Sequence, residues 1–367
     1  METILLIHHC DSWGGAGVSL SSLIDMLKND YHVVVVVPHS GSAVYNKAIN
    51  QGVDVIALEM PIGMISAYSG GPKTFSRTFV RNYFRIFKSR NALKEIIQKI
   101  RPQIIAVNSM TLSWVGKTFK KVAECICFVR ETYVNNLGMR IIKNQLRNDF
   151  HKVIFISEFD RKKFDLPNPT AVVRDSVSLE KIKTAHTKAQ SQRELGLPNK
   201  KRYLLFVGGD DPIKGLKLLQ SAFQYISSKD IVCIVAGNVV EANKGDNPNF
   251  IYIGKRNDMI DVYNAAEVLV FPVVFAHQGR PIFEAGFFGL PVIIPDFVEL
   301  AECVSHEHNG LVFKNGNPQD LSVCIERLFV ENDLYNKCSE QNYKNARQKH
   351  EQNACKNTLL QFLTNGK

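Results

Sequence analysis

Two apolar runs with a polar loop and a short helix between them form the most informative stretch of the chain. Val268–Phe275 and Leu290–Ile294 are continuous apolar runs, as expected of strands in a parallel sheet buried on both faces. Pro281 is placed to begin the helix and Gly289 to end it. Glu284 falls in its first turn, beside a loop where open α/β sheets bind phosphates, so a sugar hydroxyl and a diphosphate can be held side by side. An acid that only complements the helix dipole is the alternative.

Short apolar runs alternate with amphipathic segments through the first half of the chain, which predicts a doubly wound parallel sheet. The predicted strands are Ile4–Ile7, Val33–Val37, Val53–Leu58, Ile104–Val107, Ile126–Val129, Val153–Ile156 and Ala171–Val173, and the predicted helices are Val18–Leu27, Tyr45–Gln51, Asn91–Lys99 and Leu112–Val122. Gly15 and Gly17 lie between the first strand and the first helix. Glycines there let backbone amides approach an anion, although a tight turn also needs glycine for its own geometry.

The same order of strand, glycine loop and helix restarts after a polar connection at Glu180–Lys201. Strands are predicted at Tyr203–Val207, Ile231–Ala236 and Phe250–Ile253, and helices at Leu216–Ile226, Met259–Ala265, Asp320–Glu331 and Leu334–Thr364. The fold class is therefore α/β, with two Rossmann-like domains in tandem, residues 1–180 and residues 181–345. We expect a C-terminal helix, residues 346–367, to pack back on the first domain.

One segment, Lys73–Arg90, breaks this alternation. Its cations recur at near-helical spacing, and its aromatic residues step along another face: Lys73, Arg77, Arg81, Arg85 and Lys88, with Phe75, Phe79, Tyr83 and Phe87. A basic, aromatic amphipathic helix suits an anionic membrane surface. The alternative is a helix that packs its aromatic side chains on its own domain and solvates its cations.

Composition limits the class of protein. The 367 residues are 45% hydrophobic and 22% charged, as in an ordinary globular protein, and no apolar run approaches the ~20 residues of a membrane span. The N-terminus is expected to be a first strand and not a signal peptide, and the eight cysteines show no metal-ligand spacing, so we expect reduced thiols and a cytoplasmic protein. The net charge of +10 indicates an anionic partner: nucleic acid, a membrane surface or a phosphorylated substrate. Of these three partners, we do not expect nucleic acid.

Lys214 lies in the second glycine loop, where an ammonium can meet a leaving diphosphate, or instead pair with Asp210 or Asp211. Its significance comes from a series of short motifs in a fixed order: Gly208…Lys214-Gly215, Ala236-Gly237, Ile253-Gly254, Tyr263–Val268, Gly279…Glu284-Ala285, Gly289–Val292, Glu302 and Asn309–Val312. In this order they resemble the retaining nucleotide-sugar glycosyltransferases of the GT-B fold, specifically glycosyltransferase family four. The Gly14–Gly17 loop is similar to that family's N-terminal glycine loop, so the resemblance covers nearly the whole chain.

The resemblance implies an active site in the cleft between the domains. Lys214 would bind the donor diphosphate and Glu284 the nucleotide ribose, while the amides around Gly279–Phe283, a stretch that includes Pro281 and Ile282, would hold the phosphates. Gly15, Gly17, Gly208 and Glu302 would help to form the donor pocket.

Three departures from the family pattern affect this site. Ala276 replaces a usual glutamate, with His277 next to it; Gly209 replaces a usual arginine; and Arg130, followed by Glu131, stands where a histidine is usual. Arg280 is the candidate to replace the missing cation, so Lys214, Glu284 and Arg280 form the expected catalytic set. On the acceptor side we expect Arg130, Glu131 and His277.

We therefore expect a retaining hexosyltransferase that needs neither metal nor cofactor. It would move a sugar from a nucleotide-diphosphate donor to a glycan or lipid-linked acceptor in cell-surface polysaccharide synthesis, at the inner face of the plasma membrane. A nucleotide-sugar 2-epimerase of the same fold is one alternative. A catalytically inactive sugar-nucleotide-binding subunit, suggested by the three departures, is the other.

Overall fold

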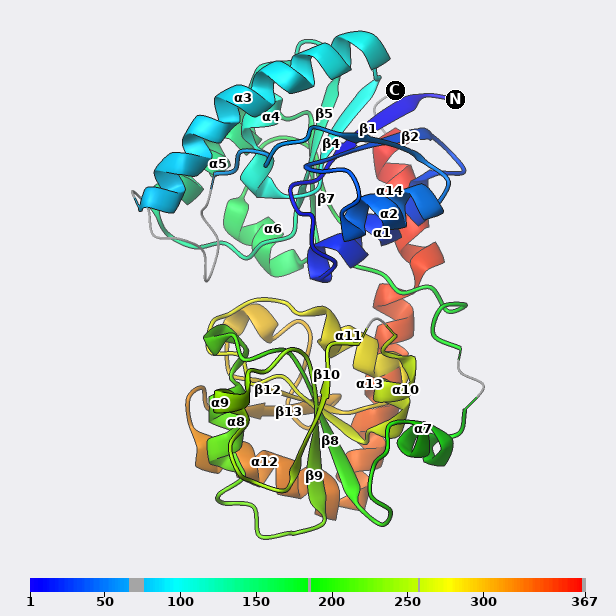
Figure 1. Cartoon of the computed structure of the whole chain (residues 1–367), viewed down its shortest axis with the longest axis vertical. Coiled ribbons are helices and arrows are strands. Elements are labelled where there is room, and N and C mark those ends of the chain that lie inside the picture. Colours follow the sequence, from blue (N-terminus) through cyan, green and yellow to red (C-terminus); the bar gives the residue numbers. More distant parts are fainter. Residues whose placement is uncertain (66–75, 184–185, 257, 365–367) are drawn as a thin grey trace. The chain divides into compact units, whose positions relative to one another are not determined.

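The computed structural model of the protein describes residues 1–65, 76–183, 186–256 and 258–364. The chain divides into two compact units, coloured in sequence order in Figure 1. The first unit comprises Met1–Ser176 together with Gln352–Lys367, and the second comprises Val177–Glu351.

Within its described residues, the first unit is built on a seven-stranded parallel sheet in the order β3-β2-β1-β4-β5-β6-β7. Its strands are β1 (Thr3–Ile7), β2 (His32–Val37), β3 (Asp54–Ala57), β4 (Ile104–Val107), β5 (Glu124–Val129), β6 (Lys152–Phe155) and β7 (Thr170–Val172). Its helices are α1 (Gly15–Leu27), α2 (Ala43–Asn50), α3 (Arg77–Ile100), η1 (Met110–Leu112), α4 (Trp114–Phe119), α5 (Leu137–Asp149), α6 (Glu158–Phe164) and α14 (Gln352–Thr364).

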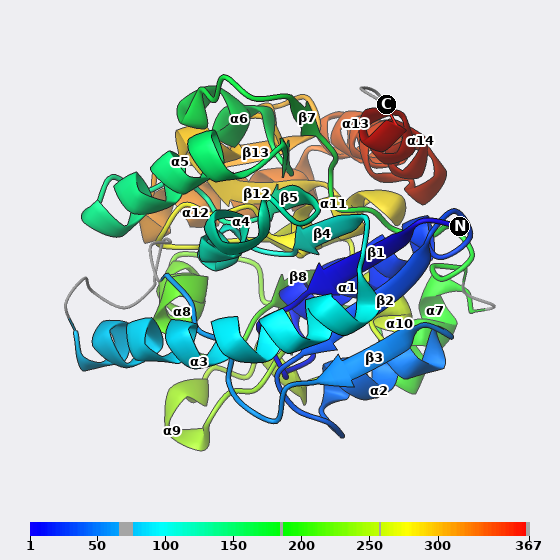
Figure 2. The same cartoon turned by 90° about the horizontal axis from the view of Figure 1, so that it is seen from above.

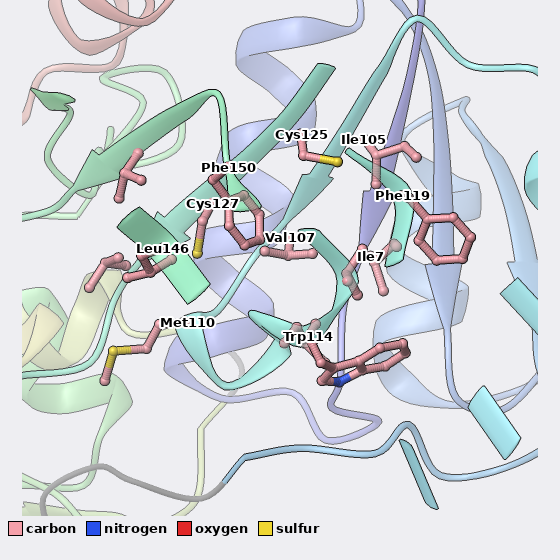
Figure 3. Packing of buried hydrophobic residues seen from close by; sticks show 14 of the residues in the cluster. Ile7, Ile105, Val107, Met110, Trp114, Phe119, Cys125, Cys127, Leu146 and Phe150 are labelled. Carbon is pink, nitrogen blue, oxygen red and sulfur yellow. The ribbon is translucent and has the colours of Figure 1, made fainter. Parts of the chain in front are cut away.

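Both faces of this sheet are buried, which explains why its strands are continuously apolar. Along β1, Leu5 and Ile7 point to one face and Ile4 and Leu6 to the other, the period of two that a strand imposes. Helices α3, α4, α5 and α6 cover the first face, where Figure 3 shows Ile7 and Val107 packed close to Trp114. Helices α1, α2 and α14 cover the second face.

Within its described residues, the second unit has a six-stranded parallel sheet in the order β10-β9-β8-β11-β12-β13. Its strands are β8 (Arg202–Val207), β9 (Ile231–Ala236), β10 (Phe250–Gly254), β11 (Val268–Val270), β12 (Val292–Pro295) and β13 (Gly310–Phe313). Its helices are α7 (Lys188–Glu194), η2 (Pro212–Lys214), α8 (Leu216–Ala222), α9 (Glu241–Lys244), α10 (Ile260–Ala265), α11 (Arg280–Phe287), η3 (Val298–Leu300), α12 (Pro318–Val330) and α13 (Asn332–His350). Helices α10 and α11 cover one face, and α8 and α12 cover the other.

Each sheet reverses its strand order at one point. Strand β1 pairs with β2 and β4, and β8 pairs with β9 and β11, so the chain turns back between β1 and β4 and between β8 and β11. We call these two places the first and second reversal points. Open α/β sheets bind ligands beyond the carboxyl ends of the strands at such points.

Several elements differ from the sequence predictions. The predicted strand Val268–Phe275 ends at Val270, because Pro272 cannot donate to a ladder and Val274 N donates to Ile213 O (3.1 Å) in another loop. The predicted helix Leu334–Thr364 is two helices, since Glu351 has an extended backbone (φ −70°, ψ 134°).

The connection expected at Glu180–Lys201 contains the helix α7, which begins with a capping box at Thr187 and Gln190. The predictions also missed helices α5 and α6.

Helix α3 replaces two predicted segments. The predicted segment Lys73–Arg90 and the predicted helix Asn91–Lys99 are one helix, Arg77–Ile100, which starts where the Ser76 side chain accepts a hydrogen bond from Phe79 N (3.2 Å). Lys73 and Phe75 lie outside the described residues. The view in Figure 2 shows α3 running along the first unit as one uninterrupted cyan helix. No helix in the described part of the chain is both long and apolar enough to cross a membrane.

Candidate active site

The second reversal point is built from two loops that are locked together. The loop after β8 carries η2 and Gly215, and the loop after β11 carries Pro272 and Val274. Gly215 has φ 79°, and a Cβ there would lie 1.8 Å from the carbonyl oxygen of Pro272, so only glycine fits. Together with the Val274 N to Ile213 O hydrogen bond, this close approach fixes the position of Lys214 at the end of η2.

Lys214 meets a neutral partner across the reversal point. Its Nζ lies 3.2 Å from Nε2 of His277, while Nδ1 of His277 lies 3.0 Å from the carbonyl oxygen of Phe275. A carbonyl only accepts, so Nδ1 carries the proton and Nε2 accepts from the ammonium. Burial lowers the pKa of His277, and the charge of Lys214 lowers it further, which keeps the imidazole neutral. Burial also lowers the pKa of Lys214, against a smaller opposite effect of Asp211.

The two aspartates of this loop have other tasks. Asp210 accepts hydrogen bonds from Val240 N and Asn243 Nδ2, both at 2.9 Å, and these bonds lower its pKa. Asp211 caps η2 by accepting from Ile213 N (3.1 Å). The alternative in which an aspartate pairs directly with Lys214 is thus not the arrangement found.

Glu284 and Arg280 pair one helical turn apart on α11. Arg280 Nε donates to Glu284 Oε1 (2.9 Å), and the buried hydroxyl of Tyr263 donates to Glu284 Oε2 (2.7 Å). Each carboxylate oxygen can accept two hydrogen bonds and accepts one of these, so each has the capacity for a further bond from a ligand hydroxyl. The guanidinium of Arg280 also lies over the ring of Phe283, 5.1 Å from its centroid.

The other residues expected to bind the donor make backbone contacts or contact their neighbours. Gly279 caps α11 and would place a Cβ 2.4 Å from the Phe271 ring, and Pro281 and Ile282 follow in the first turn. Gly208 N donates to Ala236 O (2.9 Å). Glu302 accepts from Gln278 Nε2 (3.2 Å), in the loop that leads into α11.

Two departures from the family pattern have a structural context. At Gly209 a Cβ would lie 2.6 Å from the backbone oxygen of Asn238, so this loop has no room for the arginine usual there. His277, expected on the acceptor side, lies in the second unit against Lys214.

The first reversal point holds a denser polar cluster. His8, directly after β1, and Asn108, directly after β4, are joined by a 3.1 Å hydrogen bond from Asn108 Nδ2 to His8 Nδ1. Arg130 donates through Nε to Asn108 Oδ1 (2.7 Å) and forms an ion pair with Asp175. Burial chiefly, and then the charges of His9 and Arg130, lower the pKa of His8.

Glu131 lies in the same cluster. Its carboxylate accepts from the Ser109 hydroxyl and from Met110 N (3.2 Å), and burial raises its pKa.

The glycine loop after β1 leads into helix α1, which begins at Gly15, and Gly17 packs against Trp13 and Val44. His8, Asn108 and Asp175 were not identified from the sequence, and Tyr263 was placed in a motif without being assigned a role. Position directly after a strand is a signal that could have found the first two. Among the described residues no group of three or more His, Cys, Asp or Glu side chains is arranged to hold a metal ion.

Comparison with known proteins gives one family match. Residues 187–345 match the family model described as "Glycosyl transferases group 1". A D-inositol 3-phosphate glycosyltransferase from Streptomyces bingchenggensis is 28% identical over 186 residues, 45% of this chain and 41% of that protein. An uncharacterized glycosyltransferase from Methanocaldococcus jannaschii is 24% identical over 160 residues, 39% of this chain and 40% of that protein. The matched part thus spans less than half the length of these relatives.

Solved structures resemble the whole chain. The Anabaena protein HepE, solved in complex with UDP and glucose, has a TM-score of 0.81 at 15% identity and covers 100% of both chains. WaaG, a glycosyltransferase involved in lipopolysaccharide biosynthesis, has a TM-score of 0.72 at 12% identity and covers 99% of this chain and 100% of its own. At these identities the likeness shows the fold, two Rossmann-like units in the GT-B arrangement of strands and helices.

Proposed function

We propose that the protein is a retaining glycosyltransferase, because residues 187–345 match the glycosyl transferases group 1 model and the chain has the GT-B fold, as the sequence predicted. It moves a sugar from a nucleoside-diphosphate donor to a glycan or lipid-linked acceptor in cell-surface polysaccharide synthesis. The observation that carries the proposal is Lys214, a cation held at the second reversal point by a neutral partner. Such a cation is suited to a diphosphate because no carboxylate partner has to be displaced first.

The chemistry follows from where charge develops. The acceptor oxygen attacks the anomeric carbon, the bond from that carbon to the diphosphate oxygen breaks, and the acceptor proton passes to the leaving phosphate. Negative charge therefore grows on the diphosphate, and preorganised donors that meet it lower the barrier. We assign this task to Lys214 and the N-terminal amides of α11, with Arg280 holding Glu284 for the nucleotide ribose. The reaction as proposed needs no metal or cofactor.

Lys214→Ala and Glu284→Gln test the proposal. Each variant should lose ten-fold or more in donor affinity or turnover, because each removes a charged contact to the donor. Thermal shift and calorimetry with UDP, UDP-glucose, GDP and GDP-sugars measure affinity, and release of nucleoside diphosphate measures turnover. Lys217→Ala, which removes an exposed lysine at the second residue of α8, is the matched control. Wild-type affinity and rate in both test variants would contradict the proposed site.

We further propose that the enzyme works at an anionic membrane through one face of α3. The face is defined by Arg77, Val80, Arg81, Phe84 and Lys88, which share one side of the helix at spacings of three and four residues. Phe84 is 67% exposed and Val80 44% exposed, so these apolar side chains are not packed on the described part of their own unit. Beside this face, Tyr83 and Phe87 are 55% and 53% exposed.

The rest of α3 is anchored in the core. Leu93 and Ile97 are buried, the Ser89 hydroxyl accepts from Gly63 N (3.0 Å), and Gly63 packs against the backbone of Ile86. The helix therefore presents cations with exposed aromatic side chains at one end while its other end packs on the sheet. This charge pattern complements anionic lipid headgroups, where each cation contributes about 1 kcal/mol.

Vesicle co-sedimentation tests the membrane proposal. Wild type should pellet with phosphatidylglycerol vesicles, not with phosphatidylcholine vesicles, and less as salt rises. Substitution of Arg77, Arg81 and Lys88 by glutamine should abolish pelleting. Substitution of Lys94 and Lys99 by glutamine is the control, because it removes two exposed cations farther along the same helix. Equal pelleting of all three proteins, or of none at low salt, favours a helix that only solvates its cations.

A further inference from the structure

We propose that His277 is a positioning residue for the donor-binding lysine: its Nε2 lone pair holds the Lys214 ammonium at the second reversal point. The inference rests on the proposed function, since it concerns how Lys214 is presented to a nucleoside diphosphate. It gives His277, which was expected on the acceptor side from the sequence, a role toward the donor instead.

The contact joins two loops that the fold has already fixed. Lys214 follows β8, and His277 follows β11, its parallel neighbour. The approach of Gly215 to Pro272 and the hydrogen bond from Val274 N to Ile213 O leave little freedom between the two backbones. A lysine side chain still has four rotatable bonds, so a rigid backbone alone does not place its ammonium.

The imidazole is held on both sides. Its Nδ1–H donates to the Phe275 carbonyl, which sets the tautomer, and its ring lies edge-on to Phe271 with the centroids 5.4 Å apart. The Nε2 lone pair is thereby directed at Lys214 Nζ, 3.2 Å away. Fixing one ring nitrogen so that the other keeps a defined role is the usual way in which a histidine is oriented.

A neutral acceptor suits this task better than a carboxylate. A carboxylate would also orient the ammonium, but it would cancel the charge that a diphosphate needs. The imidazole uses one of the three N–H donors of Lys214 and leaves two donors and the full positive charge. The entropy of ordering the lysine is then lost on folding and not on donor binding.

A double-mutant cycle on UDP binding tests the inference. His277→Phe keeps a ring of similar shape but lacks the acceptor, and it should weaken UDP binding about five- to tenfold when Lys214 is present. In a Lys214→Met background the same change should alter binding less than about twofold. His277→Gln, whose amide oxygen reaches the place of Nε2, should restore most of the affinity, whereas the shorter His277→Asn should not.

The outcomes separate this inference from the proposed function. If wild type binds UDP but His277→Phe lowers UDP affinity equally in the wild-type and Lys214→Met backgrounds, only the role of His277 is overturned. The same holds if His277→Gln does not restore the affinity. Failure of wild type to bind any nucleoside diphosphate overturns both. Two-bond ¹H–¹⁵N spectra of histidine-labelled wild type, assigned against His277→Gln, give a readout that does not depend on a folded phenylalanine variant. They should show a neutral imidazole protonated at Nδ1, and a charged or Nε2-protonated ring overturns the inference.

Discussion

At the first reversal point His8 and Asn108 connect the ends of β1 and β4, whereas at the second Lys214 and His277 connect the loops after β8 and β11. The two places have the same topology and the same pairing of a histidine with a polar side chain across the gap. Their electrostatics differ. Arg130 at the first point forms an ion pair with Asp175, while Lys214 at the second contacts a neutral imidazole.

This difference shows how one fold can separate two tasks. A buried cation with a carboxylate partner is compensated and holds neighbouring segments together, but it offers little attraction to an anion. A half-buried cation with a neutral partner, such as Lys214, keeps its field and can gain an anionic ligand. Strand order thus determines where a site lies, and the partner of a single cation determines what the site attracts.

The largest expected effect comes from breaking the compensated pair. Asp175→Asn leaves Arg130, only 11% exposed at its side chain, without its counter-charge, and should cost about 4 kcal/mol of the stability of the first unit. Both tryptophans, Trp13 and Trp114, lie in that unit, so urea unfolding followed by tryptophan fluorescence reports on it selectively. Lys214→Met at the second point should leave the free energy of unfolding within about 0.5 kcal/mol of the wild-type value. A loss below about 1 kcal/mol in Asp175→Asn would contradict the contrast.

Acid should destabilise the first reversal point next most strongly. Burial lowers the pKa of His9 from 6.5 to about 4, so the folded imidazole stays neutral at a pH where the unfolded one is protonated. The contribution of neutral His9 to the free energy of unfolding is complete above pH 6.5. It is lost as pH falls toward 4, which lowers that free energy by about 3 kcal/mol. The same fluorescence assay between pH 7 and 4 measures it. His9→Gln, which cannot titrate at this position, should reduce the slope while His8 continues to contribute, and an unchanged slope in that variant would refute the assignment.

Substitution of the glycines in the two loops by alanine should change stability less than the two preceding changes, and the effects at the two loops should have a defined order. Gly215→Ala must place a Cβ in a left-handed conformation against the Pro272 carbonyl and should cost about 2 kcal/mol. It should also weaken UDP binding by moving Lys214. Differential scanning calorimetry of the second unit's transition measures the first effect.

Gly15→Ala is the opposite case and the smallest effect. Apart from its chain neighbours and the backbone of its own helix, no heavy atom of the described residues lies within 4 Å of a Cβ built there. A helix also favours alanine over glycine, so the free energy of unfolding should stay the same or rise by about 0.5 kcal/mol. A large loss of stability in the fluorescence assay would show that the first loop is as constrained as the second.

Much of the fold could be predicted because its signals are local. Buried parallel strands are continuously apolar, and two series of such strands with glycine loops led correctly to two Rossmann-like units. Predictions were wrong where a single residue overrode the pattern. Pro272 ends β11 early although the following residues are apolar, and Glu351 divides the last helix although its flanks are helical.

The site was predictable only in part, for a related reason. Lys214 and Glu284 could be singled out because each sits in a short motif. Arg280 is only four residues from Glu284, but the partners of the two cations Lys214 and Arg130 lie far away in sequence. His277 is 63 residues from Lys214, and Asp175 is 45 residues from Arg130, so no local pattern indicates either contact. Whether a cation is compensated is thus the property that the sequence alone conceals.

Helix α14 has a consequence for biosynthesis. Cys355, Leu359 and Leu363 fill the second face of the first sheet, and Lys152 in β6 donates to the Leu363 carbonyl (2.8 Å). A ribosome that adds ~5 to 20 residues per second needs roughly 10 to 35 s to translate the whole second unit before this helix appears. During that interval all strands of the first sheet have been synthesised, but one of its covering helices has not. Apolar surface of the sheet is therefore exposed to chaperones and proteases. The second unit is complete in sequence by Glu351, so the part of the protein that is translated first is the part that finishes folding last.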